Sequence, residues 1–134
     1  MTDIKLNHLA IVVVDMEAAL RFWRESLGLA QSGEIESVPA ESVDIAFLRL
    51  GDAHIELIQP TANESGVAKY LAKRGAGMHH LCLEAPDLDS KLAELSAAGY
   101  ELINEQPRER DGRRYAFIHP ESTGGVLLEL YERV

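Results

Sequence analysis

Two stretches of the sequence, 72 residues apart, follow the same pattern. Residues 8–20 read HLAIVVVDMEAAL, and residues 80–92 read HLCLEAPDLDSKL. Each begins with His-Leu, passes through small and aliphatic residues to an aspartate, and reaches a leucine five positions later. Two further blocks repeat at similar offsets, namely 46–48 over 116–118 and 55–57 over 128–130. The pattern predicts two copies of one structural unit, because recurrence at a fixed period marks a repeat.

Each copy is predicted to contain one helix and four strands. An apolar run rich in β-branched residues is typical of a buried strand, and an aspartate before residues at helical spacing is typical of a helix N-cap. In the first half, Asp15 is therefore expected to begin a helix that Gly28 ends. The expected strands of this half are Leu6–Val14, Ala30–Ser37, Val43–Leu50 and His54–Ile58, with a hairpin turn at Gly51-Asp52.

The second half is predicted to repeat this order after a linking helix, Gly66–Arg74. Its expected helix is Asp87–Ala98, and its expected strands are His79–Glu84, Glu101–Asn104, Arg114–His119 and Gly125–Glu132. The predicted fold class is α+β, with two tandem βαβββ units forming a curved mixed sheet around a cleft. The units are expected at about 4–60 and about 77–133, with the linking helix at about 64–75, in one domain spanning 1–134.

Charge and composition limit the classes of protein to consider. The chain has 13 Lys or Arg against 22 Asp or Glu, a net charge of −9, so a nucleic-acid partner is not expected. Its 134 residues, 46% of them hydrophobic, suit one globular domain. The single cysteine, and the lack of a signal-like or membrane-spanning apolar segment, predict a cytoplasmic protein without membrane contact.

Four potential metal ligands stand at matching places in the two halves. His8 and His80 lie on the first strands, and Glu56 and Glu129 lie on the last strands, at spacings of 48 and 49 residues. If the halves pair about a pseudo-twofold axis, two imidazoles and two carboxylates meet in the cleft. Such a set suits a divalent first-row ion and leaves coordination positions for water or substrate, but it does not separate Co, Ni, Zn, Mn and Fe.

A structural role remains the alternative for each of these residues taken alone. A single histidine on a strand is more often hydrogen-bonded in a core than bound to metal, and only the matched pairs favour the metal site. His79 adjoins His80 but is expected to face the other side of its strand. His54 and His119 lack counterparts in the other half, so structural or surface roles are expected, and Cys82 is interpreted as a small core residue.

Longer blocks of the sequence resemble a known family. The blocks that carry the resemblance are 6–10, 55–61, 67–75, 77–81 and 117–130, and they span nearly the whole chain. With the paired units and the His/Glu/His/Glu set, they resemble the vicinal oxygen chelate superfamily, and within it the methylmalonyl-CoA epimerases most. The linking-helix block and the block Pro120-Glu-Ser-Thr-Gly-Gly-Val126 are the most specific of these.

The resemblance implies a metal-dependent enzyme that interconverts the 2R and 2S forms of an acyl-CoA thioester, methylmalonyl-CoA, through a metal-stabilised enolate. It implies a homodimer, and it makes Glu129 one acid–base group as well as a metal ligand. The position of the family's second base is occupied by Ile45, which cannot take a proton. Glu41 and Asp44 are the neighbouring candidates, although strand alternation predicts that Asp44 points away from the cleft.

Two clusters of basic residues could meet the phosphates of a CoA tail. They are Arg108, Arg110, Arg113 and Arg114 in one, and Lys69, Lys73 and Arg74 in the other. A solvated turn and helix face is the equally good alternative. Two other functions also stay open for the chain: a glyoxalase I type isomerase with the same metal site, and a non-catalytic binding or resistance protein of the same fold.

Overall fold

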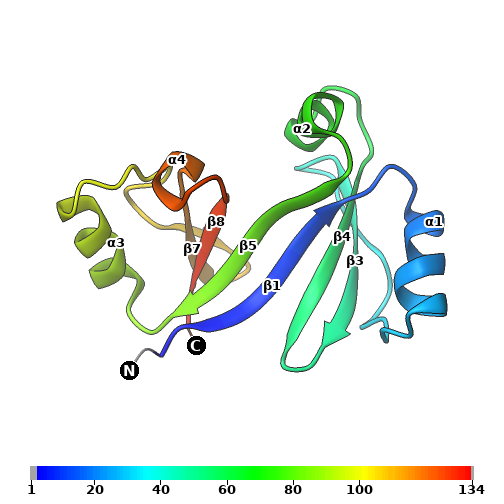
Figure 1. The fold of residues 1–134 in the computed structure, drawn as a ribbon, viewed down its shortest axis with the longest axis horizontal. Coiled ribbons are helices and arrows are strands. Elements are labelled where there is room, and N and C mark those ends of the chain that lie inside the picture. Colours follow the sequence, from blue (N-terminus) through cyan, green and yellow to red (C-terminus); the bar gives the residue numbers. More distant parts are fainter. Residues whose placement is uncertain (1–2, 134) are drawn as a thin grey trace. The chain divides into compact units, whose positions relative to one another are not determined.

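The computed structural model describes residues 3–133. Its element order is strand, helix and three strands, present twice, with a helix between the two sets and a further short helix before the last strand of the second set (Figure 1). The first set is β1 (Lys5–Val12), α1 (Met16–Leu20) with its π-helical continuation η1 (Arg21–Ser26), β2 (Glu36–Val38), β3 (Val43–Leu50) and β4 (Ala53–Pro60). The connecting helix is α2 (Gly66–Arg74). The second set is β5 (Gly77–Ala85), α3 (Leu88–Ala97), β6 (Arg108–Arg110), β7 (Arg113–Ile118), α4 (Pro120–Thr123) and β8 (Leu128–Glu132).

The chain divides into two compact units, and strand β1 contributes to both. One unit combines the first residues, up to His8, with residues 80–133, and the other is Leu9–His79. The first part of β1 therefore belongs with the second half of the sequence. We call these the His8–His80 unit and the Leu9–His79 unit.

In the Leu9–His79 unit, β3 pairs antiparallel with β2 on one side and with β4 on the other. Side chains from one face of β3 and β4 form a core with α1: Val13, Met16, Leu20, Ala46, Leu48, Ile55 and Leu57. The helix begins where expected, because the Asp15 side chain accepts hydrogen bonds from the backbone N–H groups of Glu17 and Ala18. The opposite face of this sheet carries Val43 and Ile58, which pack with Val67 of α2.

In the His8–His80 unit, β8 lies between β5, to which it is parallel, and β7, to which it is antiparallel. Strand β6 pairs antiparallel with β7. One face of this sheet packs against α3 through Leu88, Leu92, Ala116, Ile118 and Leu130 (Figure 1). Because strand residues alternate between faces, the residues next to these in sequence, such as Glu129 and Phe117, lie on the opposite face.

Three of the predicted strands are wrong in whole or in part. Residues 101–104 form only a single bridge, Leu102 to Ile118, because Asn104 Oδ1 accepts the Phe117 N–H and the ladder stops there. The second strand of this half is β6 (Arg108–Arg110) instead. Residues 30–37 are interrupted at Gly33, whose φ is 73°. The last strand begins at Leu128 rather than Gly125, after the short helix α4, which the sequence pattern did not predict.

Within residues 3–133, no helix has the length and apolar character needed to cross a membrane.

Candidate metal centre

Three of the four predicted ligands come from three strands of the His8–His80 unit. His8 lies on β1, His80 on β5 and Glu129 on β8. Cys82 pairs in register with Glu129, and residues 80 and 82 share a face of β5 because strand side chains alternate. This face lies opposite the α3 core, so the fold places imidazole and carboxylate groups together on one buried surface.

These three side chains meet at hydrogen-bonding distance. His8 Nε2 lies 3.1 Å from His80 Nε2, and Glu129 Oε1 lies 3.1 Å from His80 Nε2 and 3.4 Å from His8 Nε2. Glu129 and His8 are each 1% exposed, and His80 is 8% exposed. Three ionisable groups are therefore held together out of solvent, which requires that they satisfy one another or bind an ion.

The spacing of the three atoms matches that expected around a metal ion. Ligand atoms about 2.1 Å from an ion are about 3.0 Å apart at octahedral angles and about 3.4 Å apart at tetrahedral angles. The triangle formed by His8 Nε2, His80 Nε2 and Glu129 Oε1 has sides of 3.1, 3.1 and 3.4 Å. Two nitrogens and a carboxylate oxygen also match the donors that divalent first-row ions prefer. These residues thus fit a divalent ion.

Glu129 is ionised over the whole physiological pH range. Its burial, the largest influence, raises its pKa, but hydrogen-bond and charge interactions with His8 and His80 outweigh that effect and lower the pKa to about 2. The other carboxylate oxygen, Oε2, accepts a hydrogen bond of 3.3 Å from Nη2 of Arg110, whose guanidinium also stacks 4.6 Å from the ring centre of Tyr115. The two oxygens of Glu129 therefore face different partners.

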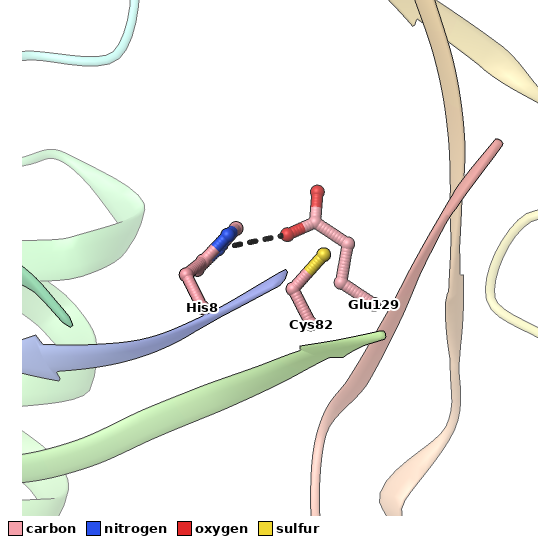
Figure 2. Close-up of side chains that lie close together, drawn as sticks. All are labelled: His8, Cys82 and Glu129. Carbon is pink, nitrogen blue, oxygen red and sulfur yellow. Dashed lines mark ion pairs between the residues drawn. The ribbon is translucent and has the colours of Figure 1, made fainter. Parts of the chain in front are cut away.

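Cys82 is fully buried, as expected of a small core residue, but it also borders the ligand set. Its Sγ and the ligand atoms of His8 and Glu129 all lie within 4.8 Å of one another. Figure 2 shows the thiol directed toward the pair formed by His8 and Glu129. Sequence reasoning missed this proximity because Cys82 aligns with an alanine in the first half and has no ligand counterpart there.

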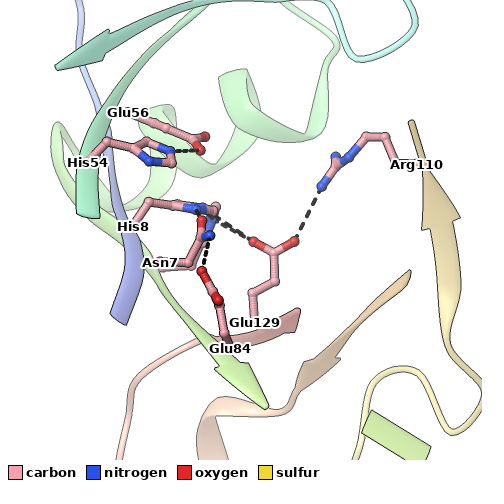
Figure 3. Close-up of polar contacts among 8 residues, drawn as sticks. Asn7, His8, His54, Glu56, Glu84, Arg110 and Glu129 are labelled. Carbon is pink, nitrogen blue, oxygen red and sulfur yellow. Dashed lines mark hydrogen bonds and ion pairs between the residues drawn. The ribbon is translucent and has the colours of Figure 1, made fainter. Parts of the chain in front are cut away.

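A second set of polar residues contacts Nδ1 of His8, the ring nitrogen that is not paired with Glu129 (Figure 3). Asn7 Oδ1 lies 2.6 Å from His8 Nδ1, and Asn7 Nδ2 donates to Glu84 Oε2 over 2.8 Å. Glu84 Oε2 is in turn 3.6 Å from Arg113 Nη2. None of these supporting roles was predicted, because Asn7 and Glu84 have no special spacing in the sequence. The signal available was that each lies on the same strand as a predicted ligand.

The fourth predicted ligand, Glu56, lies on β4 of the Leu9–His79 unit, opposite Phe47 of β3. Its Oε2 is 3.0 Å from His54 Nε2, with the side chains 12% and 29% exposed (Figure 3). His54, expected to have only a structural or surface role, is thus the ion-pair partner of a predicted ligand. The two residues stand at positions i and i+2 of one strand and share a face, which is a signal that the sequence does contain.

The two other acid–base candidates lie outside these clusters. Glu41 is exposed in the turn between β2 and β3, where its N–H donates to the carbonyl of Val38. Asp44 accepts a hydrogen bond of 2.6 Å from the Ser37 hydroxyl. Asp44 pairs with Gln59, so it lies on the face of β3 and β4 opposite to Glu56, as strand alternation predicts.

The predicted cationic clusters are partly engaged within the protein. Arg110 contacts Glu129, Arg113 contacts Glu84, and Arg114 bridges Asp89 and Glu132 at 2.7 and 3.0 Å. On α2, Lys69, Lys73 and Arg74 are exposed. The α2 side chains thus keep the solvent exposure that binding a polyanionic tail requires, whereas three of the four arginines already have acidic partners.

The Leu9–His79 unit also contains an open cavity of about 460 Å³, within the size range of ligand sites. Its wall includes His54, together with Phe47 and Arg49 of β3 and the acidic residues Glu36 and Asp52. His54 thus contacts Glu56 on one side and borders the cavity.

Comparison with known proteins identifies the family and agrees with the fold. A sequence model of the glyoxalase/bleomycin resistance protein/dioxygenase superfamily matches residues 7–117. The mitochondrial methylmalonyl-CoA epimerase of Homo sapiens is 36% identical over 128 residues, which cover 94% of this chain and 72% of that protein.

Two solved structures show the same fold. The crystal structure of a hypothetical protein from Bacillus halodurans C-125 superposes with a TM-score of 0.90 at 37% identity, covering 98% of this chain and 96% of that one. A methylmalonyl-CoA epimerase in complex with methylmalonyl-CoA and NH4+ superposes with a TM-score of 0.83 at 30% identity, covering 97% and 94%. The predicted α+β fold class is therefore confirmed. The chain belongs to the glyoxalase/bleomycin resistance protein/dioxygenase superfamily, in a family that includes the methylmalonyl-CoA epimerases.

Proposed function

We propose that this protein is a divalent-metal-dependent epimerase that interconverts the 2R and 2S forms of methylmalonyl-CoA. The observation that carries the proposal is the triangle of buried His8, His80 and Glu129 atoms, with sides of 3.1 to 3.4 Å, in a member of the epimerases' family. The α-proton of the substrate lies between a thioester and a carboxylate, so its removal is assisted wherever the resulting negative charge is stabilised.

His8, His80 and Glu129 would hold the ion, with Glu56 as the fourth ligand on the argument of the repeat. When bound, a divalent ion would polarise the thioester carbonyl and stabilise the charge that develops on deprotonation. Co, Ni, Zn and Mn all accept this donor set.

Glu129 is proposed to exchange the α-proton on one face of the substrate. Its Oε1 faces the two histidines, so Oε2, which lies toward Arg110, is the oxygen that would accept and return the proton. Epimerisation also requires an acid–base group on the opposite face of the planar intermediate. Glu41 and Asp44 stay predictions for that role, and the orientation of Asp44 on β3 makes Glu41 the better of the two.

Two further features are proposals: a homodimer, which the family resemblance implies, and a cytoplasmic location, which the single cysteine favours. The exposed α2 cations Lys69, Lys73 and Arg74 are proposed to contact the phosphates of the CoA tail, because charge-assisted contacts to phosphate need exposed donors.

The test is solvent deuterium exchange at the α-carbon of pure (2R)-methylmalonyl-CoA, followed together with formation of the 2S form. The protein is compared after chelation and after addition of each candidate metal. We expect exchange and epimerisation to stop with chelator and to return with metal. Metal-loaded protein that exchanges no α-proton would contradict the proposal, and formation of lactoylglutathione from a glutathione hemithioacetal would redirect it to a glyoxalase I reaction.

The matched control for this test is a pair of variants, Glu129→Gln and Asn63→Ala. Asn63 is an exposed turn residue and is none of the proposed metal ligands or acid–base groups. Asn63→Ala should keep full exchange, whereas Glu129→Gln should lose it.

A further inference from the structure

Asn7 lies between a proposed metal ligand and a carboxylate, and it contacts both. Its Oδ1 is 2.6 Å from His8 Nδ1, and its Nδ2 is 2.8 Å from Glu84 Oε2. All three residues belong to the His8–His80 unit. The short distances mean that each contact must join one donor to one acceptor.

The Glu84 carboxylate determines the direction of both hydrogen bonds. A carboxylate has only acceptors, so the group of Asn7 that faces Glu84 must be the amide NH2. The carbonyl oxygen of Asn7 therefore faces His8, and because this oxygen can only accept, His8 Nδ1 must carry a proton. In the neutral ring the proton is then absent from Nε2. Nε2 is the atom directed at His80 and Glu129.

Glu84, at the end of this series of hydrogen bonds, is in turn held by Arg113. Arg113 Nη2 lies 3.6 Å from Glu84 Oε2, and Arg113 Nε donates to the backbone carbonyl of Glu132 over 3.2 Å. The Arg113 guanidinium also stacks 4.5 Å from the ring centre of Tyr131. The Tyr131 ring in turn meets the His8 ring edge-on at 5.7 Å. Arg113 thus contacts both Glu84, which orients Asn7, and Tyr131, whose ring contacts His8.

We propose that Asn7, oriented by Glu84 and Arg113, is a positioning residue that holds neutral His8 in its Nδ1–H tautomer and so presents Nε2 as a ligand atom. Partners that fix the second ring nitrogen of a ligating histidine set its tautomer and ring orientation, and their loss typically weakens metal binding by about 10- to 100-fold. The functional meaning rests on the proposed metal site, but the tautomer itself is a property of the metal-free protein.

The experiment measures the histidine ring nitrogens by long-range ¹⁵N–¹H NMR in chelator-treated protein, at a pH well above the ordinary histidine pKa of about 6.5. We expect His8 to be predominantly Nδ1–H in the wild type and in Asn63→Ala. In Asn7→Ala, the Nε2–H tautomer should gain population. A wild-type His8 that is mainly Nε2–H, or an unchanged tautomer in Asn7→Ala, would overturn the proposal.

A double variant separates positioning from a general loss of structure. Asn7→Asp alone keeps an acceptor for His8, but it places the new carboxylate at position 7 next to the carboxylate of Glu84. Combining it with Glu84→Gln reverses the outer hydrogen bond, because the amide at position 84 then donates to the carboxylate at position 7. N7D/E84Q should therefore restore the Nδ1–H tautomer. If it resembles Asn7→Ala instead, the direction of the hydrogen bonds does not control His8, and the proposal fails.

Metal titration of the same proteins supplies the second measurement, with Zn²⁺ or Co²⁺ alone as the probe. We expect Asn7→Ala to weaken binding by about 10- to 100-fold and N7D/E84Q to recover most of that loss. An unchanged affinity in Asn7→Ala would overturn the positioning role. A wild type that shows the expected tautomer but binds no metal would instead refute the proposed metal centre, so the two failures are distinguishable.

Discussion

Glu56 and Glu129 occupy equivalent positions in the two copies of the repeat, yet their surroundings differ. Each follows a hydrophobic residue on the last strand of its copy and precedes a leucine. Glu129 is 1% exposed, contacts His8 and His80 through one oxygen and contacts Arg110 through the other. Glu56 is 12% exposed, and its ion pair is with His54, a neighbour on its own strand.

The difference shows that a repeated sequence position specifies the strand and the face on which a residue lies. It does not determine the electrostatic environment of that residue. Glu129 meets histidines from two other strands, and these interactions lower its pKa to about 2. The ion pair of Glu56 with His54 joins residues i and i−2 of one strand and needs no long-range pairing. A role in catalysis is thus proposed for Glu129, and a role in ligation alone for Glu56.

Substitution of the two glutamates by glutamine should separate these roles in catalysis. Glu129→Gln is expected to lower the rate of α-proton exchange by about 100-fold or more, because a positioned acid–base group contributes about 10²- to 10⁴-fold. Glu56→Gln keeps an oxygen donor and should show the smaller loss. The measurement is deuterium exchange into methylmalonyl-CoA at saturating metal. Equal losses in both variants would mean that Glu129 acts only as a ligand.

Acid stability should reveal the environment of Glu129 in metal-free protein. The pKa of Glu129 falls from 4.5 to about 2 on folding. The native state therefore binds this proton less readily than the unfolded chain, and the resulting stability is present above about pH 4.5 and lost as the pH falls toward 2. The contribution is on the order of 3 kcal/mol.

Urea unfolding at a series of pH values measures this effect. The free energies of unfolding of wild type and Glu129→Gln should differ most above about pH 4.5 and converge toward pH 2. Parallel curves for wild type and Glu129→Gln would contradict the lowered pKa.

His54 should affect metal binding through Glu56. Because His54 Nε2 lies 3.0 Å from Glu56 Oε2, His54→Ala is expected to weaken metal affinity by about 10-fold. In the double variant with Glu56→Gln the two losses should not add, since both act through one contact. Titration with Co²⁺ measures all four proteins of this cycle. Full additivity would show that His54 and Glu56 act independently.

The exposed pair of Asp89 and Arg114 should show the smallest effect. A hydrogen bond from Arg114 lowers the pKa of Asp89 and, with the Arg114 charge, outweighs the slight effect of burial. Solvent and salt screen such a pair, so Asp89→Asn should leave the melting temperature nearly unchanged at physiological ionic strength. Thermal unfolding at low and high salt measures this. A large decrease in melting temperature would show that the ion pair orients α3 on its sheet.

Much of the fold could be predicted because the relevant signals are local. The caps at Asp15 and Asp87 and the strand Val43–Leu50 match expectation, since capping and alternation depend on neighbouring residues. The strand predicted at residues 101–104 is wrong because pairing depends on a distant partner. There, the Asn104 side chain takes the N–H of Phe117 that a longer ladder would have used.

The predicted ligands illustrate the same limit. The repeat identified His8, His80 and Glu129, and the structure brings these three together. It could not identify Asn7, Glu84 or Cys82 as their neighbours, because these residues are not repeated in the other half.

The sequence by itself determined the two-copy plan, the strand positions of the histidines and glutamates, and the family. These follow from residue type and spacing along the chain. Only the tertiary structure decided which nitrogen of His8 faces Glu129 and why the Glu129 pKa is low. Both depend on contacts between β1, β5 and β8, whose residues lie far apart in sequence and whose side-chain directions emerge only when the strands align.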